Sequence, residues 1–208
     1  MAGGRIPATS RASFAKRSDV GALCGAGYCP TCPEGDAGGA VVATCAAAAK
    51  CGRSHDDLPD IAKPFPDAYA DIPEAERAAR TKLSSELCVL RYPDQVDFFI
   101  RGVILVPILG GDDALGFGAW LSQSQTNFER YVRGEAMTPT VGLLGNRFNH
   151  HAGVDLDLKA RAHFRDGGSR PELELDPNSD HPFSADQRNG ITLARAWEIV
   201  HLCLPTWS

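Results

Sequence analysis

Residues 97–122, DFFIRGVILVPILGGDDALGFGAWLS, contain the stretch of sequence that decides the fold. Two apolar runs, 97–109 and 115–122, flank the turn sequence Gly110-Gly111-Asp112-Asp113. Long runs rich in Val, Ile and Phe that are separated by a glycine turn predict two antiparallel strands. A shorter strand predicted at 87–92 precedes them, so the three segments should form an antiparallel meander.

Further elements are predicted on both sides of this meander. The predicted helices cover 71–84, 124–133 with Ser124 or Thr126 as the cap, and 192–204 with Thr192 as the cap. Further strands are predicted at 156–164 and 172–175, and residues 138–145 should form a short strand or a loop. Residues 52–70 should form a loop because prolines interrupt them, and a capping box at Ser184 and Gln187 predicts a short turn that ends at Gly190. Strands in succession with inserted helices are typical of the α+β class, here a mainly antiparallel sheet with helices packed on it.

The first forty residues differ in composition from the rest of the chain. They are rich in Gly, Ala, Ser and Arg and contain almost no large apolar side chains. Such a segment cannot bury enough surface to offset the entropy lost on ordering. We therefore expect a disordered or flexible N-terminal tail at 1–40 and a single globular domain at 41–208.

The charge balance narrows the range of partners. The chain has 21 basic and 26 acidic residues, and four of the basic ones lie in the first eighteen positions, where no acid occurs. The remaining body is acidic, which argues against general nucleic-acid binding. The longest apolar stretches, 40–49 and 103–109, are shorter than the roughly 20 residues of a membrane-spanning helix. We expect a cytoplasmic protein without membrane contact.

Several common catalytic signatures are absent from the sequence. It contains no nucleophile elbow, no phosphate-binding loop, no dinucleotide fingerprint and no His-Glu-x-x-His motif. The fragment Gly116-Phe117-Gly118 lies inside a predicted strand, where glycines indicate a bulge or close packing.

The seven cysteines supply the clearest chemical signal. An odd number does not suggest a closed disulfide framework, and five of the seven crowd into residues 24–51. Thiolates and imidazoles are the ligands that zinc prefers, in tetrahedral sets of four. The candidate zinc ligands are Cys29, Cys32, Cys45, Cys51 and His55. Unligated thiols in a flexible segment, or a redox pair at the Cys-x-x-Cys sequence, are the alternatives.

Other polar side chains raise narrower hypotheses. Arg101 interrupts an apolar strand, so its charge should pair with a carboxylate, face solvent or bind an anion. Asp180 beside His181 could orient a base or simply hold a turn. The sequence Asn149-His150-His151 could join a metal or acid–base cluster with Asp155 and Asp157, or form a solvated loop. Cys88 and Cys203 lie among apolar residues and should be buried and inert.

Short stretches in a fixed order carry a family resemblance over residues 51–202. They are Cys-Gly-x-x-His-x-x-Leu-Pro at 51–59, Pro-Asp-x-Tyr at 66–69, Ile-Pro-x-x-Glu-Arg at 72–77, Phe-Phe-Ile-Arg-Gly at 98–102, Trp-x-Ser-x-Ser at 120–124 before Asn127-Phe128, Asp-Leu-Lys at 157–159, Arg170-Pro171, His181-Pro182 and residues 187–191. The chain resembles the bacterial family catalogued as domain of unknown function 2199. That family has no assigned reaction, and its members usually open with Cys-x-x-Cys-Gly. Here Ala48 takes the place of the first cysteine, and Cys45 is the nearest preceding one.

Two functions remain open at the level of sequence. The first is a non-enzymatic domain that binds a small molecule or a protein, with a structural zinc knuckle. Its candidate binding residues, expected to line one cleft, are Arg101, Trp120, Asn146, Lys159, Arg170 and His181. The alternative is a metal-dependent enzyme that uses the cysteine–histidine cluster and a base such as His181. Catalytic zinc would need an open coordination position beside a pocket.

Overall fold

The structure is a computed structural model that describes residues 58–148, 150, 158–165 and 169–204. All of these belong to one compact unit, Thr44–Ser208. The predicted tail at 1–40 lies outside the described residues, and so do the candidate zinc ligands.

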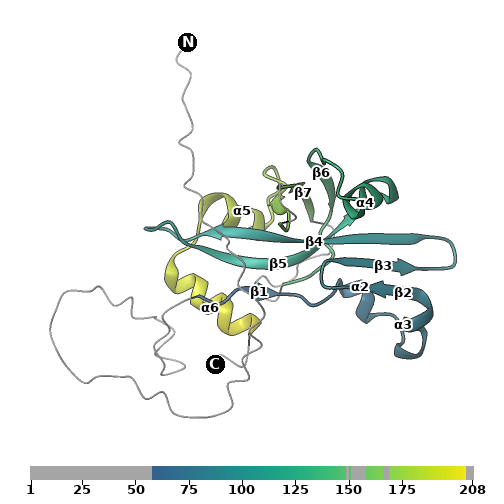
Figure 1. The fold of residues 1–208 in the computed structure, drawn as a ribbon. Coiled ribbons are helices and arrows are strands. Elements are labelled where there is room, and N and C mark those ends of the chain that lie inside the picture. The colour runs from purple at the N-terminus through teal and green to yellow at the C-terminus, as the bar shows by residue number, and fades with distance from the viewer. Residues whose placement is uncertain (1–57, 149, 151–157, 166–168, 205–208) are drawn as a thin grey trace, which may run out of the picture. The chain divides into compact units, whose positions relative to one another are not determined.

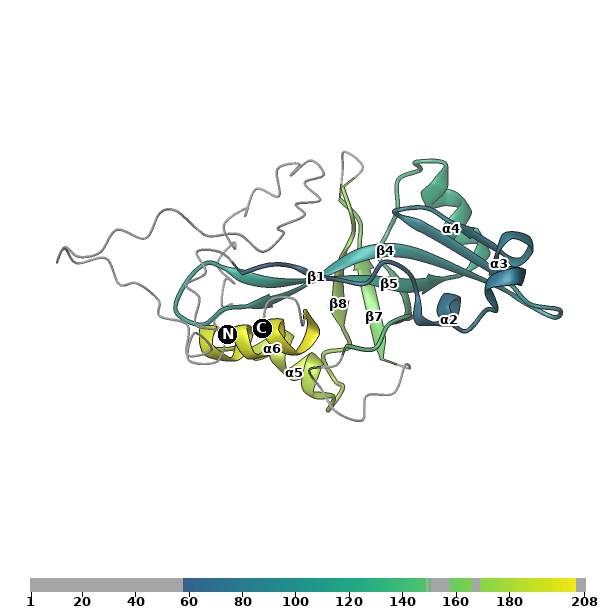
Figure 2. The ribbon, with the colours of Figure 1, turned by 90° about the horizontal axis from the view of Figure 1, so that it is seen from below.

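The described part of the chain folds into one sheet with helices packed on it (Figures 1 and 2). The strands are β1 (Ile61–Ala62), β2 (Thr81–Leu83), β3 (Leu87–Arg91), β4 (Val96–Pro107), β5 (Ala114–Gln123), β6 (Thr140–Leu143), β7 (Lys159–His163) and β8 (Glu172–Leu175). The helices are α2 (Asp67–Ala70), α3 (Glu74–Arg80), α4 (Gln125–Val132), α5 (Pro182–Asn189) and α6 (Leu193–Cys203). The main strand order is β1-β5-β4-β8-β7-β6, and β2 and β3 extend the sheet beside β4. The predicted α+β class is confirmed.

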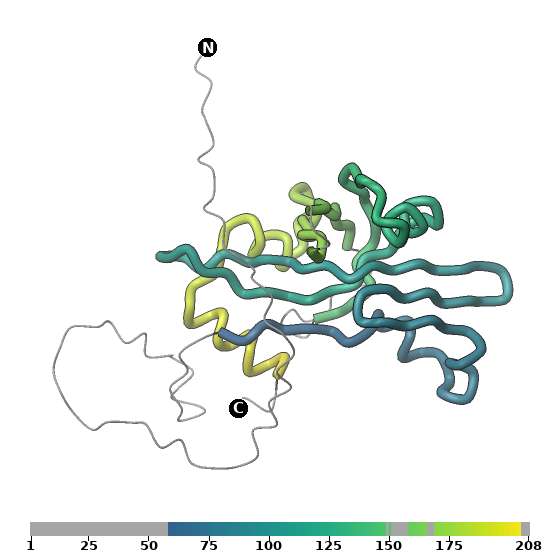
Figure 3. Tube along the Cα trace, in the orientation of Figure 1, coloured from purple at the N-terminus to yellow at the C-terminus, as the bar shows by residue number. Residues whose placement is uncertain are grey.

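The long hairpin β4–β5 forms the centre of the sheet, and the sequence predicts this hairpin (Figure 3). It pairs without interruption from Phe98 opposite Gln123 to Pro107 opposite Ala114. Gly110 adopts a φ of 95° in the connecting turn, a conformation that side chains with a Cβ rarely adopt.

The sheet is mixed, which the sequence did not predict. β1 runs parallel to β5, and β8 runs parallel to β4. The remaining strand pairs of the described residues are antiparallel. Both parallel pairs join segments that are far apart in the chain, so no local turn sequence announces them.

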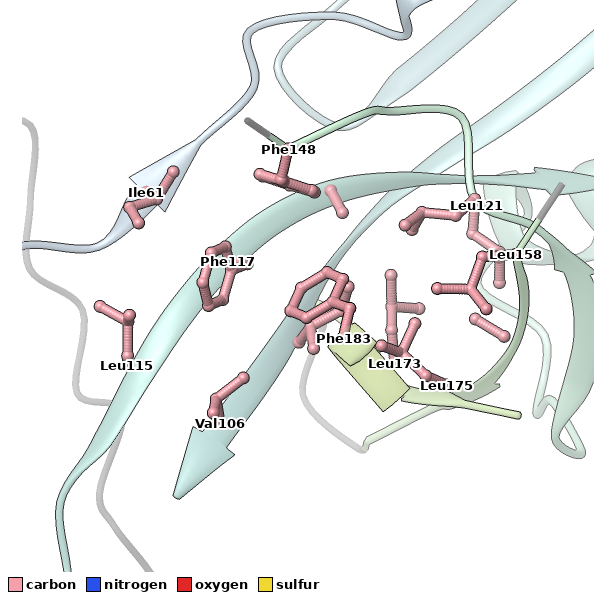
Figure 4. Close-up of a cluster of buried hydrophobic side chains, with 14 of the residues drawn as sticks. Ile61, Val106, Leu115, Phe117, Leu121, Phe148, Leu158, Leu173, Leu175 and Phe183 are labelled. Atoms are coloured by element: carbon pink, nitrogen blue, oxygen red, sulfur yellow. The ribbon is translucent and has the colours of Figure 1, made fainter. Parts of the chain in front are cut away.

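The sheet curls until its last strand returns to β5. Leu144, just after β6, bridges Leu121 of β5, and the Gly145 amide donates to the Trp120 carbonyl at 2.7 Å. The curled strands and α5 enclose the main core (Figure 4). Its aromatic centre is Phe117, whose ring contacts the rings of Phe148 and Phe183 at centroid distances of 5.2 and 4.9 Å.

A second, smaller cluster lies on the other face of β4. It consists of Ile72, Cys88, Leu90, Phe99 and Trp120, with Ala68 and Tyr69 of α2 packed against it. Residues along β4 alternate between the two faces, because successive side chains of a strand point to opposite sides. Ile100 and Ile104 therefore enter the main core, whereas Phe99 enters the second cluster.

Two helix predictions need correction. The helix predicted at 71–84 ends at Arg80, and the chain continues as β2, which pairs with β3 from Thr81 opposite Leu90. Cross-strand pairing thus overrides the helical preference of the charged segment. The short turn predicted from Ser184 is a full helix, α5, whose N-cap is His181. Gln187 does not complete a capping box, since its side chain hydrogen-bonds the backbone of β8 at Leu173 and Leu175.

Other local predictions are confirmed or incomplete. Ser124 caps α4, and Thr192 caps α6 by accepting from the Arg195 amide. The segment predicted as a loop at 52–70 contains β1 and α2 in its described part. None of the helices in the described residues has the length and apolar character needed to cross a membrane.

Candidate functional site

The candidate site lies where two strands meet end to end on one edge of β4. Because β5 occupies the other edge of β4, both β3 and β8 must use this one. β3 begins at Leu87 opposite Ile100, and β8 begins at Glu172 opposite Val103. Between these points the Arg101 amide donates to the Glu86 carbonyl at 2.9 Å. We call this place the seam and define it by Ser85, Glu86, Arg101, Arg170 and Pro171.

A two-pronged ion pair joins the two segments that meet at the seam. Arg170 Nε donates to Glu86 Oε2 at 2.8 Å, and Arg170 Nη2 donates to Glu86 Oε1 at 2.6 Å. The hydrogen bonds to Glu86 raise the pKa of Arg170 above its ordinary value. Both side chains are partly exposed, so the pair adds at most about 1 kcal/mol to the free energy of unfolding. Its main effect is that both carboxylate oxygens of Glu86 accept hydrogen bonds from Arg170.

Arg101 has no carboxylate partner within the described residues. Its guanidinium lies 5.9 Å from the ring centre of Trp120, and its Nη1 donates to the Ser85 carbonyl at 3.2 Å. Its Nε is buried and has no hydrogen-bond partner in the described structure. Burial, and then the charge of Arg170, lower the pKa of Arg101. An arginine stays protonated at neutral pH despite such a shift, so the seam carries an uncompensated positive charge.

Hydrogen bonds fix both the side chain and the backbone of Trp120. Its side chain is fully buried, and its indole Nε1 donates to the Lys63 carbonyl at 3.1 Å. Its backbone amide donates to Asn146 Oδ1 at 3.0 Å, while Asn146 Nδ2 donates to the Phe65 carbonyl and to Asp67 Oδ1 at 2.9 and 3.0 Å. The side chain of Asn146 therefore makes hydrogen bonds inside the protein, and it helps to position the Trp120 ring that lies against Arg101.

Two glycines of β5 let charged groups approach the strand beside Trp120. A Cβ at Gly118 would stand 3.1 Å from the Ala62 Cβ and 3.6 Å from Arg101 Nη2. A Cβ at Gly116 would clash with the carboxylate of Asp60. The close packing predicted for Gly116 and Gly118 is therefore confirmed, and it places Asp60 and Arg101 along one short strip of β5.

The structure brings four of the six candidate binding residues together and leaves the other two apart. Arg101, Trp120, Asn146 and Arg170 gather at or beneath the seam. Lys159 lies on β7 and lines a separate hollow of about 230 Å³ with Arg161 and Asp176. His181 caps α5 through its Nδ1, which accepts from the Phe183 amide at 3.1 Å.

Burial lowers the pKa of His181. Neither His181 nor Lys159 is joined to Arg101 or Arg170 by a hydrogen bond or ion pair that the described residues show.

Two members of the site have no recognisable sequence signal. Glu86 stands in an ordinary Ser-Ser-Glu turn, and Asp60 stands in a segment predicted as a loop. Long-range contacts alone bring them to Arg170 and Gly116. Arg170 takes the carboxylate of Glu86, and Arg101 pairs with no carboxylate among the described residues.

Another hollow of the described structure lies elsewhere and offers less chemistry. It measures about 490 Å³ and lies between the β3–β4 turn and the start of α4. Two of its polar side chains bond within the protein: Gln123 accepts from Thr140 at 2.8 Å, and Ser124 caps α4. The seam, where a buried donor has no acceptor, is therefore the better candidate.

The remaining chemical predictions concern cysteines and histidines. Cys88 is buried as predicted, and burial raises its pKa to about 12, whereas Cys203 is only partly buried. His150 is buried and stacks on Phe117 at 5.0 Å, which contradicts a solvated loop at that residue. His163 bonds to Glu174 at 2.7 Å. Within the described ranges no group of three or more His, Cys, Asp or Glu could hold a metal ion.

Comparison with known proteins gives one finding. Residues 44–191 match the family described as "Uncharacterized protein conserved in bacteria (DUF2199)". No curated protein and no solved structure matches the chain. The matched segment includes every residue of the seam, and it confirms the resemblance read from the sequence. The chain therefore belongs to this uncharacterised bacterial family.

Proposed function

We propose that this protein is a non-enzymatic binding domain that holds a small anionic ligand at Arg101. The observation that carries the proposal is the half-buried guanidinium of Arg101, which among the described residues has no carboxylate partner and has a buried Nε without a hydrogen-bond acceptor. Carboxylates and phosphates are the partners that match a guanidinium most closely, through two parallel hydrogen bonds.

The energetics of the unpaired donor support a ligand. A buried donor without an acceptor costs about 1–3 kcal/mol, and native structures leave few of them. An anion beside Arg101 would supply the missing acceptor and would also offset the repulsion between Arg101 and Arg170. Glu86 cannot do both, because its two oxygens already accept from Arg170.

The supporting groups are suited to holding the guanidinium still. The guanidinium lies over the ring of Trp120, and Asn146 accepts a hydrogen bond from the backbone amide of Trp120. A charged side chain that is already positioned loses less entropy on binding than one that must be ordered by the ligand. The seam is therefore preorganised for an anion.

The test uses the full chain labelled with ¹⁵N and follows the Nε–Hε signals of its arginines by NMR. The Arg101 signal is identified by its loss in Arg101→Gln. We expect acetate, added at constant ionic strength, to shift the Arg101 signal in a saturable way. The control is Arg161→Gln, which removes an exposed arginine of β7 and should leave the response intact. A shift of the Arg101 signal that never saturates would contradict the proposal. A saturable acetate response at the signals of other arginines that persists in Arg101→Gln would contradict it as well.

We also propose a structural zinc site and a cytoplasmic location. The zinc site is supported by the spacing of Cys29, Cys32, Cys45, Cys51 and His55, and the location by the odd number of cysteines. The metal-dependent enzyme stays a prediction that starts from the same cluster.

A further inference from the structure

A second charged group stands close to Arg101 on the same strip of β5. The carboxylate of Asp60 lies against Gly116, and Arg101 Nη2 lies against Gly118, two residues further along the strand. Asp60 is exposed, and its carboxylate has no hydrogen bond or ion pair among the described residues. Its charge is felt at the seam, where it helps to raise the pKa of Arg170.

The glycine positions limit the distance between these two charges. Alternate residues of a strand are roughly 6.8 Å apart, so Arg101 Nη2 and Asp60 Oδ1 lie no more than about 13 Å apart. With a charge-assisted hydrogen bond of about 2.8 Å at each end, no more than about 7 Å remains for a molecule that reaches both. Only a small molecule with two opposite charges fits this spacing.

The other acid near this face is not available to a ligand. Glu172 stands opposite Val103 at the start of β8, but it is paired with Arg165. Val103 and Leu105 project on the same side of β4 as Arg101, opposite Gly118 and Gly116, and both are partly exposed. The strip between the two charges is therefore bordered by apolar side chains that suit a hydrocarbon segment.

We infer that the ligand of the seam is a small amino carboxylate, with its carboxylate on Arg101 and its ammonium on Asp60. This inference rests on the proposed anion site and adds a second anchor of opposite charge to it. A bare carboxylate would satisfy Arg101 and leave Asp60 unused. A bare amine would leave the Arg101 Nε unpaired.

The experiment compares matched ligands that differ by one ammonium group. The pairs are acetate and glycine, propionate and β-alanine, and butyrate and γ-aminobutyrate, which widen the spacing of the charges stepwise. Each is titrated into the labelled full chain at constant ionic strength, and Kd is taken from the Arg101 Nε–Hε signal. The variants are Asp60→Asn and, as a matched control, Asp112→Asn in the exposed β4–β5 turn.

The expected result is that in at least one pair the amino form binds about tenfold more tightly, the effect of one added charge-assisted contact. Asp60→Asn should remove this difference without weakening the binding of the plain carboxylate, and Asp112→Asn should change neither. Equal affinities within all three pairs, with saturable carboxylate binding, would overturn this inference and leave the anion site standing. No saturable response to any probe would overturn both.

Discussion

Asn146 shows how one buried side chain can support the candidate site without facing it. Its amide makes hydrogen bonds to Trp120, Phe65 and Asp67 and is 2% exposed. We predict that Asn146→Ala lowers the free energy of unfolding by about 2–4 kcal/mol, because the buried Trp120 amide and two partly buried acceptors lose their hydrogen bonds. Urea unfolding measures this change. The control, Asn178→Ala at an exposed asparagine, should stay within about 0.5 kcal/mol of the wild type. Equal effects of the two substitutions would refute the role assigned to Asn146.

Cys88 should be chemically silent in the folded protein. Burial raises the pKa of its thiol from 9.0 to about 12, so the reactive thiolate is scarce below that pH. We predict that iodoacetamide at pH 8.5 modifies the peptide containing residue 88 only when denaturant is added, as measured by mass spectrometry. Rapid modification of the native chain would show that the thiol is accessible.

The same shift gives Cys88 a defined effect on stability. In the unfolded chain the thiol loses its proton near pH 9.0, whereas in the folded chain it keeps the proton to about pH 12. The unfolded state therefore binds fewer protons above pH 9, and the contribution of Cys88 to stability falls as the pH rises through that range.

Gly102 of β4 allows β8 to approach closely. A Cβ at Gly102 would stand 2.6 Å from Leu173 Cγ and 2.9 Å from the Pro171 carbonyl oxygen. We predict that Gly102→Ala lowers the free energy of unfolding by about 1–3 kcal/mol, because Leu173 and the start of β8 must move away. Gly111→Ala is the control, since a Cβ there would find only the Asp113 amide, at 3.9 Å. A neutral Gly102→Ala in chemical unfolding would argue against this close approach of β8.

The ends of β3 and β8 are joined by the ion pair between Glu86 and Arg170, which gives a test at the seam. We predict that Glu86→Gln lowers stability by less than about 1 kcal/mol, as for other exposed pairs. It should lower the Kd for acetate, because Arg170 loses its neutralising partner. Isothermal titration and the arginine NMR signals measure this affinity. Glu129→Gln, which weakens an exposed ion pair on α4, should leave acetate binding unchanged. Weaker acetate binding in Glu86→Gln would mean that Glu86 organises the site.

For the whole chain, the metal content can be predicted and measured. We predict about one zinc per chain in protein purified under reducing conditions without a chelator or a polyhistidine tag, because one set of four ligands coordinates one zinc ion. Elemental mass spectrometry measures it. Cys51→Ser should remove the metal, whereas Cys88→Ser, at a buried thiol of the sheet, should retain it. Absence of zinc from the wild type would also remove the metal-dependent enzyme in the form predicted here.

The sequence alone determined the elements whose signals are local. The hairpin of β4 and β5 follows from two long apolar runs around a glycine turn, and the cap of α6 follows from Thr192. For α4 the sequence left Ser124 or Thr126 as the cap, and the structure has Ser124. It also determined the family, since the motif order needs no coordinates. Of the candidate site, Arg101 could be singled out because a charge inside an apolar strand requires a partner.

Only the tertiary structure decided which partner each charge has. Arg170 pairs with Glu86 across 84 positions of the chain, and within the described part of the chain Arg101 is left with a carbonyl and an indole ring. The parallel pairing of β1 with β5, which brings Asp60 to Gly116, was equally invisible in the sequence, and so was the parallel pairing of β8 with β4. Hydrogen bonds across a sheet edge and ion pairs between distant segments depend on the packing of the whole chain, and no short window of sequence contains both partners.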